Sequence, residues 1–280
     1  FGPVDANRLY VFGISEGGYG SQRLASYYAD YWAGVGPMAG GEPLKNAPVE
    51  NCANLAFSFL TGAMDEGFYR NKLTGYTKTA FDSLQAKYAG RLMNHSADSL
   101  FRHRIELIPN CGHSIDYSLT TPWLKTYKRN PYPHTFMWED YPMDGQRRQG
   151  FYNLYVMKRP KAADGLKDAS GEDRDYYEMD IQDNVIRLSV KKVTYQTLER
   201  DPVYGIDLKF TKSYHPVIGG KWKIYLNDQL VDMNRPVTVF INDRKAFEGK
   251  LVPRMEDMIT SCMEYFDPCR VFPASVDVAL

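Results

Sequence analysis

This chain of 280 residues has no surplus of charge of either sign, because 34 lysines and arginines balance 34 aspartates and glutamates. A neutral chain gives no reason to expect a nucleic acid or an anionic membrane surface as its partner. The chain also lacks an apolar run of the roughly 18 residues that a membrane-spanning helix needs. With 44% hydrophobic and 24% charged residues, the composition is that of a folded globular protein, and the length allows two domains.

Cysteine is also scarce, and the chain has only Cys52, Cys111, Cys262 and Cys269. No two of them have zinc-ligand spacing together with a second pair or a nearby histidine doublet. We therefore expect no metal ion, and the sequence indicates no organic cofactor. Cys262 and Cys269 are close enough along the chain for a local disulfide, but an even count is equally compatible with free thiols.

The first 130 residues alternate apolar runs with helix-like stretches. Strands that alternate with helices predict a parallel sheet with helices on both faces. We therefore predict an α/β domain over residues 1–130. Its expected strands and helices are the strands 9–13, 32–39, 55–60 and 103–108 and the helices 17–31, 66–89 and 114–128.

A different pattern follows the helix-breaking stretch Asn-Pro-Tyr-Pro at 130–133. Short apolar runs succeed one another, and Asn-Asp pairs at 227–228 and 242–243 suit tight turns between strands. We predict that residues 131–280 form an all-β domain, an antiparallel and immunoglobulin-like β-sandwich. The expected elements are strands at 134–138, 151–157, 176–181, 185–191, 205–210, 222–226, 237–241, 246–251 and 274–280, a polar loop at 160–175 and a helix near 255–265.

The first apolar run leads directly into Gly13-Ile14-Ser15-Glu16-Gly17, and a helix-like stretch follows. This order fits G-x-S-x-G, the nucleophile elbow, in which a serine on a sharp strand-to-helix turn exposes its hydroxyl above the edge of a sheet. The turn is crowded, so small residues are needed two positions before and after the serine. Gly18 and Gly20 would let the helix pack closely on the sheet. A plain glycine turn is the alternative, but the strand before it and the helix after it favour the elbow.

A nucleophilic serine needs a base, and the base needs an acid that orients it. Asp65 follows the predicted strand 55–60, and His113 follows the predicted strand 103–108. The carboxyl ends of parallel strands meet at one edge of a sheet, so we expect Ser15, His113 and Asp65 to form a catalytic triad there. Each residue has a plainer alternative, since Asp65 could cap the next helix and His113 could be an ordinary loop residue.

Two residues near the serine are candidates for contact with a substrate. The backbone N–H of Glu16 directly follows the nucleophile, and we expect it to donate to the oxyanion. The Glu16 side chain either lines the substrate pocket or points along the helix and contacts Arg23 or a neighbouring loop. Tyr19 is the second candidate for lining the pocket.

The stretch from Asn7 to Glu42, with GISEGGYG and GPMAGGEP, resembles the α/β-hydrolase esterases of the polyhydroxybutyrate-depolymerase and feruloyl-esterase type. NLAFSFLTGAMDE resembles the acid loop of these esterases, and PNCGHSIDY resembles their histidine loop. The resemblance covers about residues 5–128 and extends, more distantly, to prolyl-oligopeptidase-like peptidases. It implies a serine hydrolase with Ser15 as nucleophile, His113 as general base and acid, and Asp65 as orienting acid.

The same resemblance implies a substrate class and a location. The substrate would be an acyl or feruloyl ester of a carbohydrate, or a related small ester, and the enzyme would be exported to the periplasm or the medium. The β-rich remainder resembles an accessory domain. Methionine is commoner than glutamate after the serine in this family. A peptidase of the same fold and a hydrolase-like binding module without turnover are the rival interpretations.

The chain begins with Phe1, about a strand's length before Ser15, and no charged-then-apolar leader follows. An α/β-hydrolase core has further strands before its elbow strand, on the order of 100 residues at about 30 or more per strand–helix–strand unit. Those residues would include the loop that supplies a second oxyanion N–H. We therefore expect this chain to be the C-terminal part of a longer protein.

Overall fold

The structure, a computed structural model, describes residues 4–89, 100–163 and 174–280. Within these ranges, no helix combines the length and the apolar character that crossing a bilayer requires. All four cysteines are free thiols. The local disulfide between Cys262 and Cys269 that the sequence allows is therefore not formed.

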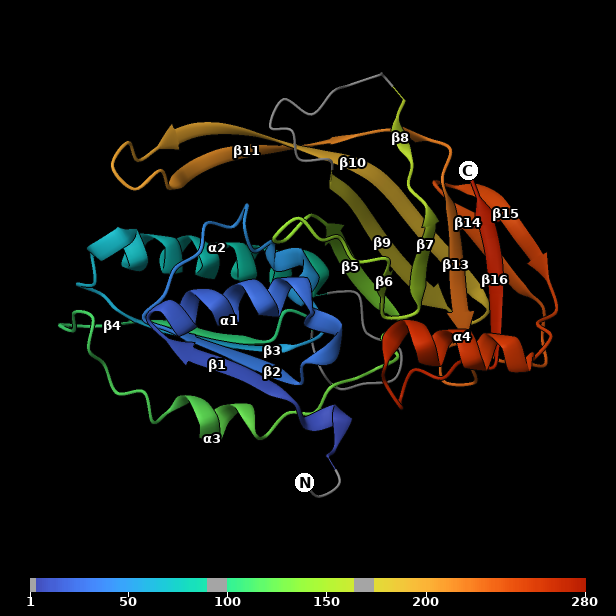
Figure 1. Cartoon of the computed structure of the whole chain (residues 1–280), viewed down its shortest axis with the longest axis horizontal. Helices are drawn as coiled ribbons and strands as arrows, with labels where there is room; N and C mark the ends of the chain where they lie inside the picture. The colour runs from blue at the N-terminus through green and yellow to red at the C-terminus, as the bar shows by residue number, and fades with distance from the viewer. Residues whose placement is uncertain (1–3, 90–99, 164–173) are drawn as a thin grey trace. The chain divides into compact units, whose positions relative to one another are not determined.

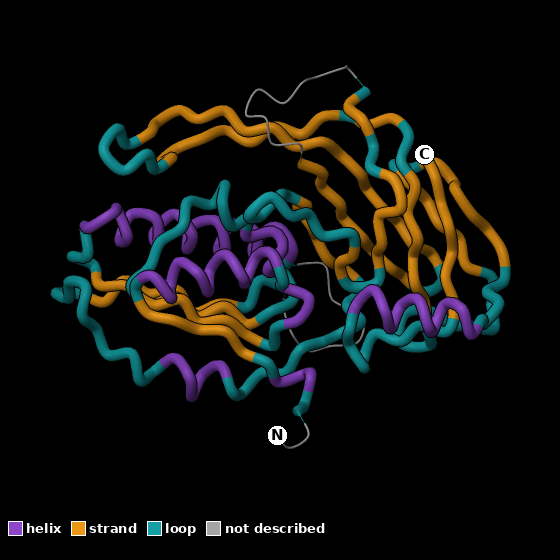
Figure 2. Tube along the Cα trace, in the orientation of Figure 1, coloured by secondary structure: helices purple, strands orange, loops and turns teal. Residues whose placement is uncertain are grey.

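The chain divides into two compact units, each described here by itself. The first unit ends at Asn130 but also includes Gln196–Thr211, and the second consists of Pro131–Tyr195 and Lys212–Leu280. The sequence predicted a continuous second domain, whereas the chain returns to the first unit for these 16 residues. Helices and strands alternate in the first unit, while strands dominate the second (Figures 1 and 2).

A parallel sheet forms the centre of the first unit. Its strands lie side by side in chain order, and each neighbouring pair runs parallel, as the sequence predicts. The two inner strands are buried along their whole length because helices cover both faces. Because the four strands run parallel, their carboxyl ends all lie at one edge of the sheet. The strands are β1 (Tyr10–Ile14), β2 (Gly34–Met38), β3 (Ala56–Gly62) and β4 (His103–Ile108).

Helices α1 (Glu16–Tyr27) and α2 (Arg70–Tyr88) lie on one face of this sheet, and the short α3 (Thr120–Leu124) lies on the other (Figure 1). The helix predicted over 114–128 is thus reduced to α3. The Asp116 carboxylate accepts a hydrogen bond from the Ser118 N–H at 2.9 Å, and this Asx turn holds the preceding segment out of a helix.

The described part of the second unit has a six-stranded sheet, a four-stranded sheet and a two-stranded sheet. The six-stranded sheet has the order β15-β14-β10-β9-β5, with β11 paired to β10; the four-stranded sheet has the order β16-β13-β7-β6; and β12 and β8 form the two-stranded sheet. Most pairs are antiparallel as predicted, but β10 and β14 run parallel, which the wholly antiparallel prediction missed. The strands are β5 (Thr135–Asp140), β6 (Gly150–Phe151), β7 (Leu154–Lys158), β8 (Lys161–Ala162), β9 (Arg174–Gln182), β10 (Val185–Arg200), β11 (Asp207–His215), β12 (Val217–Ile218), β13 (Lys221–Leu226), β14 (Val237–Ile241), β15 (Arg244–Gly249) and β16 (Ala274–Ala279).

Alternating burial along the strands builds the core of the second unit. On β10, Ile186, Leu188 and Val190 are buried, while Arg187 and Lys191 between and beyond them are exposed. Successive side chains of a strand point to opposite faces, so this pattern gives the sheet one apolar and one polar face. Helix α4 (Met255–Tyr265) lies where the sequence predicted a helix.

An ion-pair group links the two strands β13 and β16. The Asp277 carboxylate lies 2.9 Å from Lys223 Nζ and 3.3 Å from Lys221 Nζ. Burial acts to raise the pKa of Asp277, but the two ammonium groups outweigh it and hold this pKa below its ordinary value.

Candidate active site

Ser15 occupies the sharp turn between β1 and α1. Its backbone dihedral angles are φ 57° and ψ −116°, a conformation that residues with a side chain rarely adopt. The Ser15 N–H donates to the Met38 carbonyl at 2.9 Å, which ties the turn to the end of β2. Helix α1 begins at the next residue. A strained serine between a strand and a helix is the geometry that the motif predicts.

The glycines around this serine have different roles. A Cβ on Gly13 would lie 2.3 Å from the Gly17 carbonyl oxygen, and one on Gly18 would lie 2.5 Å from that of Met38. The first turn of α1 can therefore approach β1 and β2 only if these two residues are glycines. A Cβ on Gly17 or Gly20 would meet no atom within 4 Å. The predictions that the turn needs a small residue at position 17 and that Gly20 permits close packing are therefore wrong.

The structure brings Ser15, His113 and Asp65 together. His113 Nε2 lies 3.1 Å from Ser15 Oγ, and His113 Nδ1 lies 2.8 Å from Asp65 Oδ2. Both are hydrogen-bond distances. The side chain of Asp65 is 3% exposed and that of His113 is 47% exposed. The hydrogen bonds thus lead from a buried carboxylate to a serine that solvent can reach.

Main-chain contacts hold the acid loop after β3 against the histidine loop after β4. The Ala63 N–H donates to the Ile108 carbonyl, and the Met64 N–H donates to the Cys111 carbonyl, both at 2.9 Å. A Cβ on Gly62 would lie only 1.9 Å from the Gly112 carbonyl oxygen. No side chain fits between the loops, so the backbone itself sets the distance between the carboxylate and the imidazole.

Arg70 is a site residue that the sequence analysis missed. Its Nη1 donates to Asp65 Oδ1 at 3.0 Å, so each carboxylate oxygen of Asp65 has its own partner. The Arg70 guanidinium also lies 5.0 Å from the centre of the Phe68 ring, within the range of a cation–π contact. A carboxylate held on both sides keeps one orientation toward the histidine.

Unpaired polar atoms lie close to Asp65. The Tyr19 hydroxyl and Arg70 Nε are buried and form no hydrogen bond with any described residue. Burial raises the pKa of Tyr19 more than the adjacent Arg70 guanidinium lowers it. Glu42 also lies near Tyr19, and burial raises the pKa of its carboxyl group although a hydrogen bond from Asn46 opposes the change. The Tyr19 hydroxyl and Arg70 Nε have almost no surface open to a substrate, and among these residues only Tyr19 was predicted to line the pocket.

Glu16 is the first residue of α1, and its exposed carboxylate forms no hydrogen bond or ion pair with any described residue. The predicted alternative, a contact with Arg23, is therefore not made. The N–H groups of Gly18 and Tyr19 donate to the Ser15 carbonyl at 2.8 and 3.1 Å, but no such bond from the Glu16 N–H is found among the described residues. The first N–H groups of a helix lack internal partners and carry partial positive charge. The Glu16 N–H is therefore available to an oxyanion at Ser15.

The segment that returns to the first unit, residues 196–211, contacts the chain just after Asp65. The Tyr69 hydroxyl donates to Asp201 Oδ1 at 3.0 Å, and this hydrogen bond raises the pKa of Tyr69. The rings of Phe68 and Tyr204 pack with their centres 4.5 Å apart. No sequence pattern indicates these contacts, because their partners are more than 130 positions apart.

Among the described histidines, only His113 forms a hydrogen bond with Ser15. His103 Nε2 bonds to Asp82 at 2.9 Å, while His134 and His215 belong to the second unit. His95 lies outside the described residues. In the described part of the chain, no cluster of histidine, cysteine, aspartate and glutamate could hold a metal ion.

No family model matches this chain, and no curated protein matches it either. The family resemblance of the motifs therefore depends on the residues themselves.

Proposed function

We propose that this chain is a serine hydrolase that cleaves esters, with Ser15 as nucleophile, His113 as general base and acid, and Asp65 as orienting acid. The observation that carries the proposal is the hydrogen-bonded series Asp65–His113–Ser15, which ends at a serine in a strained turn. A serine hydroxyl is a weak nucleophile unless an adjacent base takes its proton. A serine that only forms a turn needs neither this strained backbone nor a neighbouring histidine that a buried acid orients.

The arrangement supports acyl transfer in two stages. Ser15 Oγ attacks the ester carbonyl carbon while His113 Nε2 accepts the hydroxyl proton, and a tetrahedral intermediate forms. The bond to the alcohol oxygen then breaks, the alcohol leaves with the proton from His113, and an acyl group remains on Ser15. Water attacks this acyl group by the same steps and releases the acid. Asp65 keeps the imidazole proton at Nδ1 and stabilises the imidazolium.

The amino end of α1 supports the charged intermediate. The Glu16 N–H can donate to the carbonyl oxygen as it becomes negative, and one such donor contributes about 3 kcal/mol to the transition state. The exposed Glu16 carboxylate would repel an anionic group of a substrate bound next to the serine. A neutral acyl group therefore fits this position best.

We also propose a fold assignment for each unit. The parallel sheet, with the triad residues on loops at its carboxyl edge, supports the later part of an α/β-hydrolase fold for the first unit. The two sheets with alternating burial support a β-sandwich, immunoglobulin-like in the sense of the sequence prediction, for the second. The carbohydrate-ester substrate and the exported location rest on the motif resemblance alone.

Labelling with a fluorophosphonate probe tests the proposed function without a guess about the substrate. We expect an adduct that mass spectrometry locates on Ser15 and that the Ser15→Ala variant lacks. A folded chain that forms no adduct, while a serine hydrolase of known activity is labelled beside it, would overturn the proposal in favour of a binding module. Peptides cleaved faster than acyl esters by the labelled protein would favour the peptidase alternative.

A further inference from the structure

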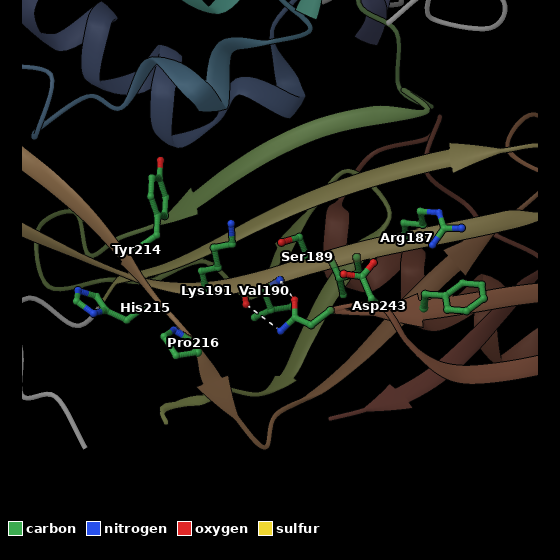
Figure 3. Close-up of a pocket in the computed structure, with 11 residues that line it drawn as sticks. Arg187, Ser189, Val190, Lys191, Tyr214, His215, Pro216 and Asp243 are labelled. Atoms are coloured by element: carbon green, nitrogen blue, oxygen red, sulfur yellow. Dashed lines mark hydrogen bonds between the residues drawn. The ribbon is translucent and has the colours of Figure 1, made fainter. Parts of the chain in front are cut away.

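The second unit has a groove of about 530 Å³ that the proposed hydrolysis does not use (Figure 3). Its lining comes from residues 187–191 of β10, residues 214–216 at the end of β11, and the turn after β14. All of these residues belong to the second unit, so the groove is a feature of that unit alone.

The groove opens where β14 stops pairing with β10. The register ends at Leu188 of β10, and the chain then turns at Asn242 and Asp243, which both have left-handed φ angles. The Asn242 amide, instead of a further strand, bonds to the backbone of Val190: Oδ1 accepts from the N–H at 2.8 Å and Nδ2 donates to the carbonyl at 3.1 Å. The Asn242 side chain thus takes the place of a neighbouring strand beside Val190. Figure 3 shows these bonds as dashed lines.

Two cations, Arg187 and Lys191, line this groove. Arg187 and Lys191 are exposed and form no ion pair with any described residue. Ser189 lies between them on the same face of β10, and the three Cα atoms span about 13 Å at about 3.3 Å per residue. In Figure 3, Lys191 and Tyr214 project to the same side of their strands.

Each cation has an aromatic neighbour. The Arg187 guanidinium lies 4.7 Å from the centre of the Phe240 ring, and Lys191 Nζ lies 5.6 Å from that of Tyr214. Tyr214 is 43% exposed, and Lys212 Nζ also lies 5.5 Å from the centre of its ring. Asp243, an exposed residue of the lining, can accept hydrogen bonds from hydroxyl groups.

The two cations and the two aromatic rings together indicate a class of ligand. A sugar ring can place its apolar C–H face on an aromatic ring, and a uronate carboxylate can form charge-assisted hydrogen bonds with arginine and lysine. A simple anion such as phosphate would use the cations but leave the rings unused. We propose that the groove binds an acidic oligosaccharide, with carboxylates at Arg187 and Lys191 and sugar faces on Tyr214 and Phe240.

Titration calorimetry on the whole chain tests this proposal, with a galacturonic acid oligomer and a neutral xylose oligomer of equal length as probes. We expect the acidic oligomer to bind at least about tenfold more tightly, because each hydrogen bond to a charged group changes affinity by about that factor. The double variant Arg187→Gln, Lys191→Gln should lose this preference, and Tyr214→Ala should weaken both oligomers. Lys250→Gln, an exposed lysine outside the groove, should change neither.

Three outcomes would overturn the assignment. These are an absence of binding by the acidic oligomer, equal affinity for both oligomers, and unchanged affinity in a double variant that circular dichroism shows to be folded. Tighter binding of a single-stranded DNA oligomer would instead assign the groove to nucleic acid, whose phosphates and bases also use cations and rings.

A different observation carries a second inference, which rests on the proposed function. Phe68 and Tyr69, just after Asp65, are consecutive residues with φ angles of 52° and 59°. Residues with a side chain hold such left-handed angles only where their surroundings fix them. The surroundings here are Tyr204, whose ring packs on Phe68, and Asp201, which accepts the hydrogen bond from the Tyr69 hydroxyl.

The strained pair leads directly into Arg70, which bonds to Asp65 and stacks over Phe68. The Asp201 backbone also fixes the hairpin turn, because its N–H donates to the Ile206 carbonyl at 2.8 Å. We infer that the hairpin tip, residues 196–211 of the hairpin that β10 and β11 form, positions the orienting acid Asp65 by holding the segment between Asp65 and α2. Asp201 and Tyr204 are then positioning residues, since they act through Arg70 and the acid loop.

The rate of fluorophosphonate labelling at Ser15 measures this positioning. We expect the double variant Asp201→Ala, Tyr204→Ala to be labelled at least about tenfold more slowly, since a misplacement near 1 Å can cost about a hundredfold. Tyr204→Phe, which keeps the ring, should restore the rate lost in Tyr204→Ala. Val203→Ala on the same tip, where the side chain is 77% exposed, should have no effect.

The outcomes separate this inference from the proposed function. An unlabelled wild-type chain would refute the proposed function. A labelled wild type with an equally labelled and folded double variant would refute the positioning role alone. If the double variant does not fold, Tyr69→Phe removes the hydrogen bond to Asp201 with a smaller change, and an undiminished rate there would also refute it.

Discussion

Replacing Gly62 by alanine should separate the acid loop from the histidine loop. The added Cβ would lie 1.9 Å from the Gly112 carbonyl oxygen, and real Cβ atoms do not come within 3.0 Å of a backbone atom. The loops must therefore move apart by about 1.1 Å, the difference between these two distances. The imidazole of His113 moves with its loop, and a shift near 1 Å at a catalytic group costs about a hundredfold in rate. We expect Gly62→Ala to slow fluorophosphonate labelling and ester hydrolysis by about that factor.

The assay is the labelling rate constant at Ser15, measured beside chemical denaturation of the same samples. Gly75→Ala is the matched control, because a Cβ at this position in α2 would meet no atom within 4 Å. This control should be labelled normally and should gain stability, since alanine is favoured over glycine in a helix by about 1 kcal/mol. A folded Gly62→Ala variant that is labelled as fast as the control would show that the contact between the loops does not set the catalytic geometry.

The remaining predictions concern the elbow, the thiols and the acid stability of the second unit. Gly13→Ala should unfold the elbow and abolish labelling, whereas Gly17→Ala should leave the chain folded, and thermal melts of both variants measure the contrast. Iodoacetamide should modify the exposed Cys262 in the native chain but Cys52 only after denaturation, because burial both covers the Cys52 thiol and raises its pKa; peptide mass mapping distinguishes the sites. The folded chain holds the pKa of Asp277 below its unfolded value, so the stability that it contributes is present above about pH 4 and is lost as the pH falls further. Asp277→Asn should therefore flatten the acid side of the curve of unfolding free energy against pH, and an equally steep curve would contradict the ion pairing.

Short-range patterns accounted for the elements that carry the candidate triad. The parallel sheet follows from alternating apolar runs and helices, and it places Ser15, Asp65 and His113 on loops at one edge. The motif around Ser15 is local, because a strand, a turn and a helix of adjacent residues determine its geometry. These features could therefore be predicted from the sequence.

What could not be predicted depends on contacts between distant residues. Arg70 reaches Asp65 because Phe68 and Tyr69 adopt left-handed angles, and no propensity of these two residues would indicate that conformation. Tyr69 forms a hydrogen bond with Asp201, which is 132 positions away along the chain. The parallel pairing of β10 with β14 has the same origin, since strand spacing does not specify which distant strand becomes a neighbour.

The return of the chain to the first unit at residues 196–211 has a consequence for the order of events during synthesis. Thr211 is made 81 residues after Asn130, which at about 5–20 residues per second takes roughly 4–16 seconds. During that interval Phe68 and Tyr69 have emerged without the tyrosine and aspartate that contact them in the finished fold. The nascent first unit therefore completes its set of contacts around the acid loop only when the hairpin tip has been translated.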